Sequence, residues 1–140
     1  MAAGMKAYEQ ESSEGMPYSL TLLLLPLALH DESRETICAN THTHLLKVVD
    51  DHPEILVSFA SRARDLVPCA MEAFGLLAQL RCIKVSDAGK VNLVPRRISS
   101  SAQLTSDEVE QCRQAAKIIG RQFARISDRA TIYATFGVRP

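Results

Sequence analysis

The residue types that could bind a metal gather in one short stretch, at Cys38, His42 and His44. Cysteine and histidine are the side chains that most often hold zinc in proteins. Cys38 and His42 are four residues apart and could share one face of a helix, whereas His44 could not. No acidic or cysteine partner stands beside them at a zinc-ligand spacing. We therefore expect no metal here and interpret the three residues as scattered polar positions.

The sequence offers no arrangement that is typical of catalysis. No serine, histidine and aspartate order indicates a nucleophile with its base, and no Gly-x-x-x-x-Gly-Lys-[Ser/Thr] phosphate loop is present. The acidic pairs at 31–32, 50–51 and 107–108 fall at predicted helix starts or links. Carboxylates at such positions stabilise the positive end of the helix dipole. We expect neither an enzyme nor a bound cofactor.

A second set of residues could bind a partner. Arg113, Lys117, Arg121 and Arg125 recur every four residues, with Arg129 beyond them. On an α-helix this spacing makes a basic stripe that drifts slowly around the outer face. Such a stripe is either a solvated face or a docking face for an acidic partner or a nucleic-acid backbone. The sequence leaves both interpretations open.

The composition limits the classes of protein to which the chain can belong. Its 140 residues are enough for one domain with its own core. The 16 basic and 16 acidic residues cancel, whereas a dedicated nucleic-acid-binding protein usually carries a basic excess. The four cysteines form no Cys-x-x-Cys pair, and the late apolar run is not a secretory signal. We expect a cytoplasmic protein without membrane contact.

The elements that position these residues are predicted to be mainly helical. The apolar stretch 20–29 carries no charge and is shorter than the roughly 20 apolar residues that a bilayer requires. A helix that is apolar on every side must be surrounded, so we expect it at the centre of the core or in an interface. Pro26 should kink or split it. A polar, weakly helical lead-in over 5–13 precedes it, and a polar link over 31–35 follows.

Two helices are expected before residue 68. Thr41 or Thr43 should cap the first, which runs to Val49. The second restarts at Pro53, shows apolar residues at helical spacing, and has 61–65 as its exposed face.

The following segment fixes the expected fold class. Pro68 is expected to begin a helix, and the β-rich runs 82–85 and 91–94 around a turn with Gly89 then form a hairpin. A helix followed directly by a hairpin is the order of a winged helix-turn-helix. We therefore predict a mainly α protein with one short β-hairpin, a winged-helix-like small domain with a long C-terminal helix.

The winged order makes DNA binding a hypothesis, because the helix before the wing usually enters the major groove. Here that helix carries only Glu72 and Arg81 as charges, and it has no Asn and no run of Arg or Lys to contact base edges. We interpret it as structural or protein-facing. A winged-helix DNA-binding transcriptional regulator is the alternative function.

The last long helix is expected to begin at Thr105, which forms a capping box with Glu108. A final short helix over 129–136 follows a cap at Ser127 or Asp128 and stops at Gly137. The apolar residues of the long helix alternate three and four apart as in an a/d seam: Val109, Cys112, Ala116, Ile119, Phe123 and Ile126. The chain is thus one domain, 1–140, with helices over 1–67, a helix and wing over 68–95, a linker over 96–104 and C-terminal helices over 105–140.

Two stretches of the sequence resemble one protein family. The first is Gly15-Met16-Pro17-Tyr18-Ser19-Leu20 running into the apolar stretch, followed by Arg34. The second is the ending, with Gly120-Arg121, Phe123-Ala124-Arg125 and Phe136-Gly137-Val138-Arg139-Pro140. Together they are similar to the small middle component of ABC-three-component systems, over nearly the whole chain.

The resemblance implies a bacterial anti-phage module, with Lamassu-type defence as a relative. In such a system an SMC- or Rad50-like ABC ATPase senses DNA, an effector, often a nuclease, acts, and the middle component joins the two. This chain would be a non-catalytic adaptor with those two partners, and DNA would be contacted only through the complex. We expect the partner interface to use Leu22, Leu25, Pro26, His30, Arg34, Arg113, Lys117, Arg121, Arg125 and Arg139.

Overall fold

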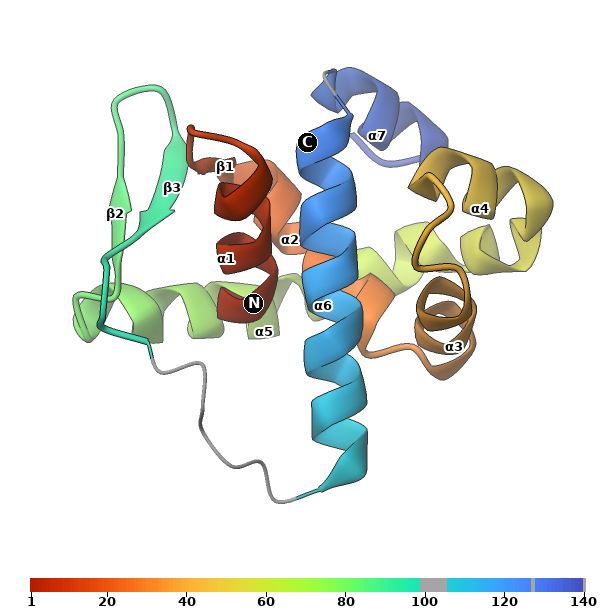
Figure 1. The fold of residues 1–140 in the computed structure, drawn as a ribbon, viewed down its shortest axis with the longest axis horizontal. Coiled ribbons are helices and arrows are strands. Elements are labelled where there is room, and N and C mark those ends of the chain that lie inside the picture. Colours follow the sequence, from red (N-terminus) through yellow and green to blue (C-terminus); the bar gives the residue numbers. More distant parts are fainter. Residues whose placement is uncertain (99–105, 127, 140) are drawn as a thin grey trace.

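The computed structural model describes residues 1–98, 106–126 and 128–139. These residues form seven α-helices, one 3-10 helix and a small three-stranded sheet (Figure 1). The prediction of a mainly α fold with a short β-hairpin is confirmed. In chain order the elements are α1 (Ala2–Glu11), β1 (Met16–Pro17), α2 (Tyr18–Ala28), α3 (Asp31–Ala39), α4 (Leu45–Asp51), η1 (Pro53–Leu56), α5 (Phe59–Gln79), β2 (Ile83–Val85), β3 (Lys90–Leu93), α6 (Asp107–Arg125) and α7 (Arg129–Thr135).

Helix α2 lies at the centre of the core, as its lack of a polar face predicts. Leu20, Leu24 and Leu27 are fully buried, and α2 packs against both α5 and α6. The helix is not split at Pro26, because it continues to Ala28. The missing amide of Pro26 removes one hydrogen bond, but the burial of the surrounding leucines holds the last turn in place.

Helices α1 and α6 cross closely, because glycines meet where they touch. A Cβ atom on Gly120 would overlap the carbonyl oxygen of Gly4, and one on Gly4 would lie 2.9 Å from the carbonyl oxygen of Ala116. Met5 and Ala7 are buried beside this crossing. The predicted weak, polar lead-in is therefore a packed helix, since its small residues let two backbones approach.

The predictions for the link over 31–35 and for a helix start at Pro68 are wrong. The expected link over 31–35 is the first half of α3, whose N-cap His30 accepts a hydrogen bond from the Ser33 amide at 3.4 Å. Pro68 does not begin a helix but lies inside α5, which runs through it without a break. Ala63 and Ala70 are buried on either side of Pro68, so packing holds both halves of the helix in one line.

The starts of the elements between α3 and α5 also differ from the prediction. Neither Thr41 nor Thr43 caps α4, because this helix begins at Leu45 after His44. The restart at Pro53 is only the four-residue 3-10 helix η1, and α5 begins after Ser58, which has a left-handed φ of 55°. A non-glycine residue in this region marks a sharp change of chain direction, so η1 and α5 are separate elements.

The predicted hairpin is confirmed, and a third strand joins it. β2 and β3 pair antiparallel with Ile83 opposite Leu93, around a turn in which Gly89 has a φ of +69°. β1 pairs with the other edge of β3, with Met16 opposite Val91, which gives the order β1-β3-β2. The sheet thus connects the hairpin to the start of α2, and the winged-helix assignment stays a prediction.

The C-terminal helices follow the predicted order. Ser106 caps α6 by accepting a hydrogen bond from the Val109 amide at 3.3 Å, while Thr105 lies outside the described residues. Ile119 and Phe123 are fully buried, but Val109 is exposed, so the apolar seam begins after the first turn. The predicted short final helix is confirmed as α7, with Asp128 as its cap.

Candidate interaction site

A groove with a volume of about 640 Å³ lies between α2, α5 and the chain after α7. We refer to it as the α2–α5 groove. Most of its lining side chains are apolar, which is typical of a site that buries part of another molecule. The lining residues are Tyr18, Ser19, Leu22 and Leu23 of α2, Ala60, Ala63, Arg64 and Val67 of α5, and Tyr133, Gly137, Val138 and Arg139 at the C-terminal end.

Apart from its charged side chains, the groove carries three hydroxyl groups, and that of Tyr18 donates to the Met71 Sδ at 2.6 Å. Leu23 and Ala63 are buried, whereas Leu22 is half-buried and Val67 is exposed. The hydroxyl groups of Ser19 and Tyr133 hydrogen-bond to each other across α2 and α7. This pair satisfies its own polar atoms, so the groove offers an apolar surface at little polar cost.

Two arginines stand at the rim of the groove. Arg64 comes from α5 and Arg139 from the chain after α7, and both side chains are exposed. No carboxylate is among the lining residues. Among the described residues neither arginine forms an ion pair or a side-chain hydrogen bond. The rim therefore carries two positive charges that no ion pair among the described residues neutralises.

The C-terminal wall of the groove is held by the end of α7. The Val138 amide donates to the Tyr133 carbonyl oxygen at 3.0 Å, and the Gly137 amide donates to that of Ala134 at 3.2 Å. Gly137 has a φ of +62°, the left-handed conformation of a helix C-terminal stop. These contacts turn the chain back toward the core, and Val138 packs against it. The predicted stop at Gly137 is confirmed and sets the place of Arg139.

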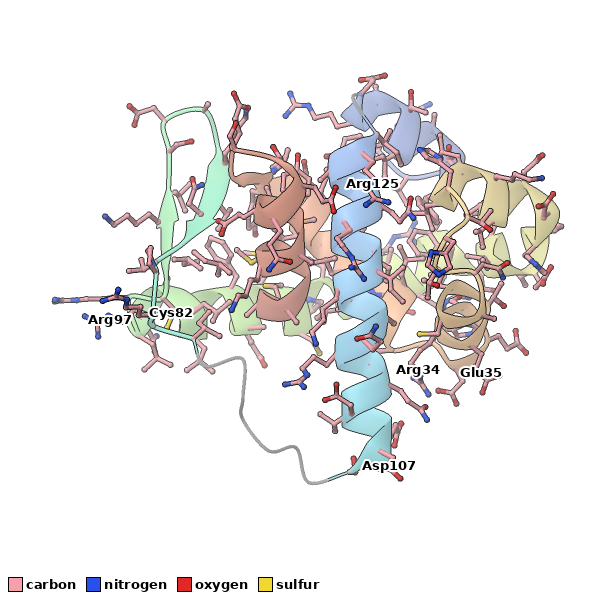
Figure 2. The ribbon with its side chains drawn as sticks, in the orientation of Figure 1. Arg34, Glu35, Cys82, Arg97, Asp107 and Arg125 are labelled. Carbon is pink, nitrogen blue, oxygen red and sulfur yellow. The ribbon has the colours of Figure 1, made fainter. Side chains whose placement is uncertain are left out.

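The basic stripe of α6 is partly occupied by partners within the chain. Arg113 pairs with Glu110 at 2.7 Å. Arg125 donates two hydrogen bonds to the Glu11 carboxylate of α1, Nη2 to Oε1 at 3.1 Å and Nε to Oε2 at 3.2 Å. The hydrogen bond from Arg125 is the main cause that lowers the pKa of Glu11. Figure 2 shows Arg125 near the C-terminal end of α6, at a distance from Arg34 of α3.

A smaller cavity of about 270 Å³ lies beside the stripe. Most of its lining side chains are polar and come from α6 and from the segment before α4, so it differs in chemistry from the α2–α5 groove. Lys117 of the stripe is half-buried and does not line it. The lining residues are Thr41, His42, Gln114, Ile118, Arg121, Gln122 and Arg125.

Arg34, a predicted interface residue, lies inside the protein. It is only 6% exposed. Its guanidinium group pairs with Asp31 at 2.7 Å and donates to the Cys112 Sγ at 3.4 Å. Burial opposes its charge, but Cys112 and Asp31 together raise the pKa of Arg34 above its ordinary value. Arg34 therefore joins α3 to α6 in the interior (Figure 2).

Three other predicted interface residues lie where α2 ends and α3 begins. Leu25 is half-buried, and Pro26 is buried inside α2. His30 is half-buried as the cap of α3. Each position has a structural explanation, and a role toward a partner stays a prediction for all three.

The candidate metal residues differ in their exposure to solvent. His42 and His44 are exposed, whereas Cys38 is half-buried. Burial is the main cause that raises the pKa of the Cys38 thiol, and nearby Arg34 opposes this rise. In the part of the chain that the structure describes, no three His, Cys, Asp or Glu side chains come together as a metal site.

Comparison with protein families identifies the chain. The family described as ABC-three component (ABC-3C) system Middle Component 3 matches residues 1–140. The chain belongs to this family. The resemblance found in the sequence is confirmed, and it covers the whole chain. No match was found among curated proteins or among solved structures.

Membership in the Middle Component 3 family means that the protein works with partner components. Leu22 and Arg139 are the two predicted interface residues that the structure brings together in the α2–α5 groove. Sequence reasoning missed Ala60, Arg64 and Val67, because a charged and small-residue segment is typical of a solvated helix face. The recurrence of 60, 64 and 67 at helical spacing is the signal that could have found this wall.

Among the described residues, no helix combines the length and the apolar character that crossing a bilayer requires.

Proposed function

We propose that this protein is a non-catalytic adaptor that links an SMC- or Rad50-like ABC ATPase to an effector in a bacterial anti-phage defence complex. The observation that carries the proposal is the match of the whole chain to a middle-component family. A middle component acts with at least two other components, so the chain must offer surfaces to bind them. We place the adaptor in the cytoplasm, with DNA contacted only through the complex.

Two surfaces of different chemistry support an adaptor with two partners. The α2–α5 groove is apolar with a cationic rim, whereas the basic stripe of α6 borders a polar cavity. They are built from different helices, and α6 crosses in front of α5 in Figure 1. Apolar burial gives affinity and complementary charge gives specificity and speed, so each surface suits a separate docking event.

The test is pairwise co-purification of this chain with the ABC ATPase and with the third protein encoded beside it. We expect a complex with each partner. Replacing Arg121 and Arg125 together by glutamate should weaken one of the two complexes, more strongly at low salt, because charge attraction is screened by ions. Replacing Arg81 and Arg97 together by glutamate is the control, since both arginines are exposed and lie outside α6. Failure of both wild-type complexes to form would contradict the proposal.

The alternative function, a winged-helix DNA-binding regulator, is supported by the order of α5 and the β2–β3 hairpin. The second half of α5 is poorly suited to DNA, because it exposes Met71 and Leu76, followed by Leu80 at its C-cap, where phosphate contacts need cations. A mobility shift of duplex DNA by the purified chain alone, lost as salt is raised, would favour this alternative.

A further inference from the structure

We propose that the α2–α5 groove binds one amphipathic helix of another component, and that acidic side chains on the edge of that helix pair with Arg64 and Arg139. This inference rests on the proposed adaptor function and names the chemistry of one partner segment. Three features of the groove carry it: the elements that line it, the charges at its rim, and the consequence of meeting a second copy of itself.

The elements that line the groove favour a helix as the occupant. Its long walls are α2 and α5, and no strand residue lines it. An extended segment would lose water from its backbone groups without an edge strand to pair with, which is costly. The hydroxyl groups of Ser19 and Tyr133 are already paired with each other. A helix satisfies its own backbone groups and buries only side chains, as in other helix-in-groove complexes.

The charges at the rim favour acidic side chains on that helix. Arg64 and Arg139 come from two different elements that line the groove, α5 and the chain after α7, and no carboxylate lines it. Among the described residues both guanidinium groups are without an ion pair. A helix in this groove can pair with them through acidic residues at the edge of its apolar face. Such charge complementarity also rejects helices with basic edges.

A second copy of this chain is a poorer occupant of the same groove. In a two-fold symmetric contact the same patch of both copies meets itself. Such a contact centred on the groove would bring Arg64 and Arg139 of one copy toward those of the other, and like charges repel. The groove therefore fits a different chain better than its own.

The experiment measures affinity in the complex of the full chain with the purified ATPase and with the purified third component. Ala60→Trp fills the groove from an exposed position of α5, and Ala78→Trp, exposed on the same helix outside the groove, is its matched control. We expect Ala60→Trp to raise the dissociation constant for one partner by about tenfold or more, which corresponds to about 1.4 kcal/mol. Ala78→Trp should leave it unchanged.

Charge reversal gives a second variant that leaves the core untouched. Arg64→Glu combined with Arg139→Glu should weaken the same complex more at low salt than at high salt. Arg81→Glu, on an exposed arginine outside the groove, should not. Thermal unfolding of each variant shows that the fold is kept, and the reversal variant decides the matter if Ala60→Trp does not fold.

A photoreactive side chain at Leu22, inside the groove, identifies the occupant. We expect crosslinks to one segment of one partner, at positions three and four residues apart that are flanked by Asp or Glu. Crosslinks only to a second copy of this chain, or unchanged affinity of both groove variants while the wild-type complex forms, would overturn the inference and leave the adaptor function standing. Absence of any wild-type complex would overturn both.

Discussion

The arginines of this protein have different environments and therefore different roles. Arg34 is buried and is held by Asp31 and the Cys112 Sγ, so it stabilises the contact of α3 with α6. Arg64 and Arg139 are exposed at the groove and are positioned to meet an outside charge. Arg125 is between these cases, because it is exposed yet pairs with Glu11 of α1.

Arg34→Ala is expected to lower the free energy of unfolding by about 2 kcal/mol, because it removes buried hydrogen bonds and leaves a void between α3 and α6. Arg139→Ala is the comparison and should change stability by less than about 0.5 kcal/mol, as exposed substitutions usually do. Urea unfolding of both variants measures the difference. Equal effects would show that the Arg34 contacts do not stabilise the fold.

Asp128 gives an expected dependence of stability on pH. The hydrogen bond from the Ala130 amide, followed by that from the Thr131 hydroxyl, holds its pKa below the ordinary value of 3.8. A lowered folded-state pKa means that Asp128 stabilises the fold above the unfolded pKa, and that this is lost as pH falls through the folded value. Asp128→Asn keeps the cap but cannot titrate.

The free energy of unfolding should therefore fall less steeply below about pH 4 in Asp128→Asn than in the wild type. Urea unfolding at several pH values between 2 and 6 measures both slopes. Glu11 and Glu54, whose pKa values are also lowered, leave a remaining slope in the variant. Identical slopes would mean that the cap does not contribute to the pH dependence.

The crossing of α1 and α6 depends on the absence of side chains at Gly4 and Gly120. Gly120→Ala should destabilise the protein by about 1–3 kcal/mol or more, since the added methyl group would overlap the Gly4 carbonyl and force the helices apart. Gly75→Ala is the matched control inside α5, where among the described residues an added Cβ atom meets nothing within 4 Å.

Because alanine has the higher helix propensity, Gly75→Ala should raise stability by up to about 1 kcal/mol. Thermal unfolding of the two variants gives shifts of opposite sign if the crossing is as close as the structure describes. If Gly120→Ala left the unfolding temperature unchanged, the contact between α1 and α6 would have space for a methyl group.

Elements with a strong local signal could be predicted from the sequence, and elements made by tertiary contacts could not. The hairpin follows from its two β-rich runs around Gly89, and the central place of α2 follows from its lack of a polar face. By contrast, α1 is stable because it packs on α6 at Gly4. No local sequence pattern predicts this contact. Pro68 is typical of a helix start, yet α5 continues through it, because Ala63 and Ala70 are buried on either side and hold the helix in place.

The candidate site shows the same division between local and tertiary signals. The apolar stretch 20–29 predicts an interface at Leu22 and the family resemblance predicts one at Arg139, but nothing local places the two residues in one groove. The α5 wall was missed, because Arg64 lies in a segment with the composition of a solvated face. That wall becomes visible only when α2 and the chain after α7 pack around it.

As a whole molecule, the protein presents two separate surfaces around one apolar core. The α2–α5 groove and the basic stripe of α6 share no residue, so the two surfaces do not overlap. Mutations at distant sites without shared contacts usually act independently. This arrangement agrees with the proposed adaptor function.

The mass of the reconstituted assembly, recorded with and without this chain, decides whether the protein is a bridge. The ABC ATPase and the third component are mixed at equal concentrations, and native mass spectrometry gives the composition of each complex. We expect a species containing all three proteins when the chain is present, and separate partners when it is left out. A complex of the two partners that forms equally well without this chain would contradict the adaptor function.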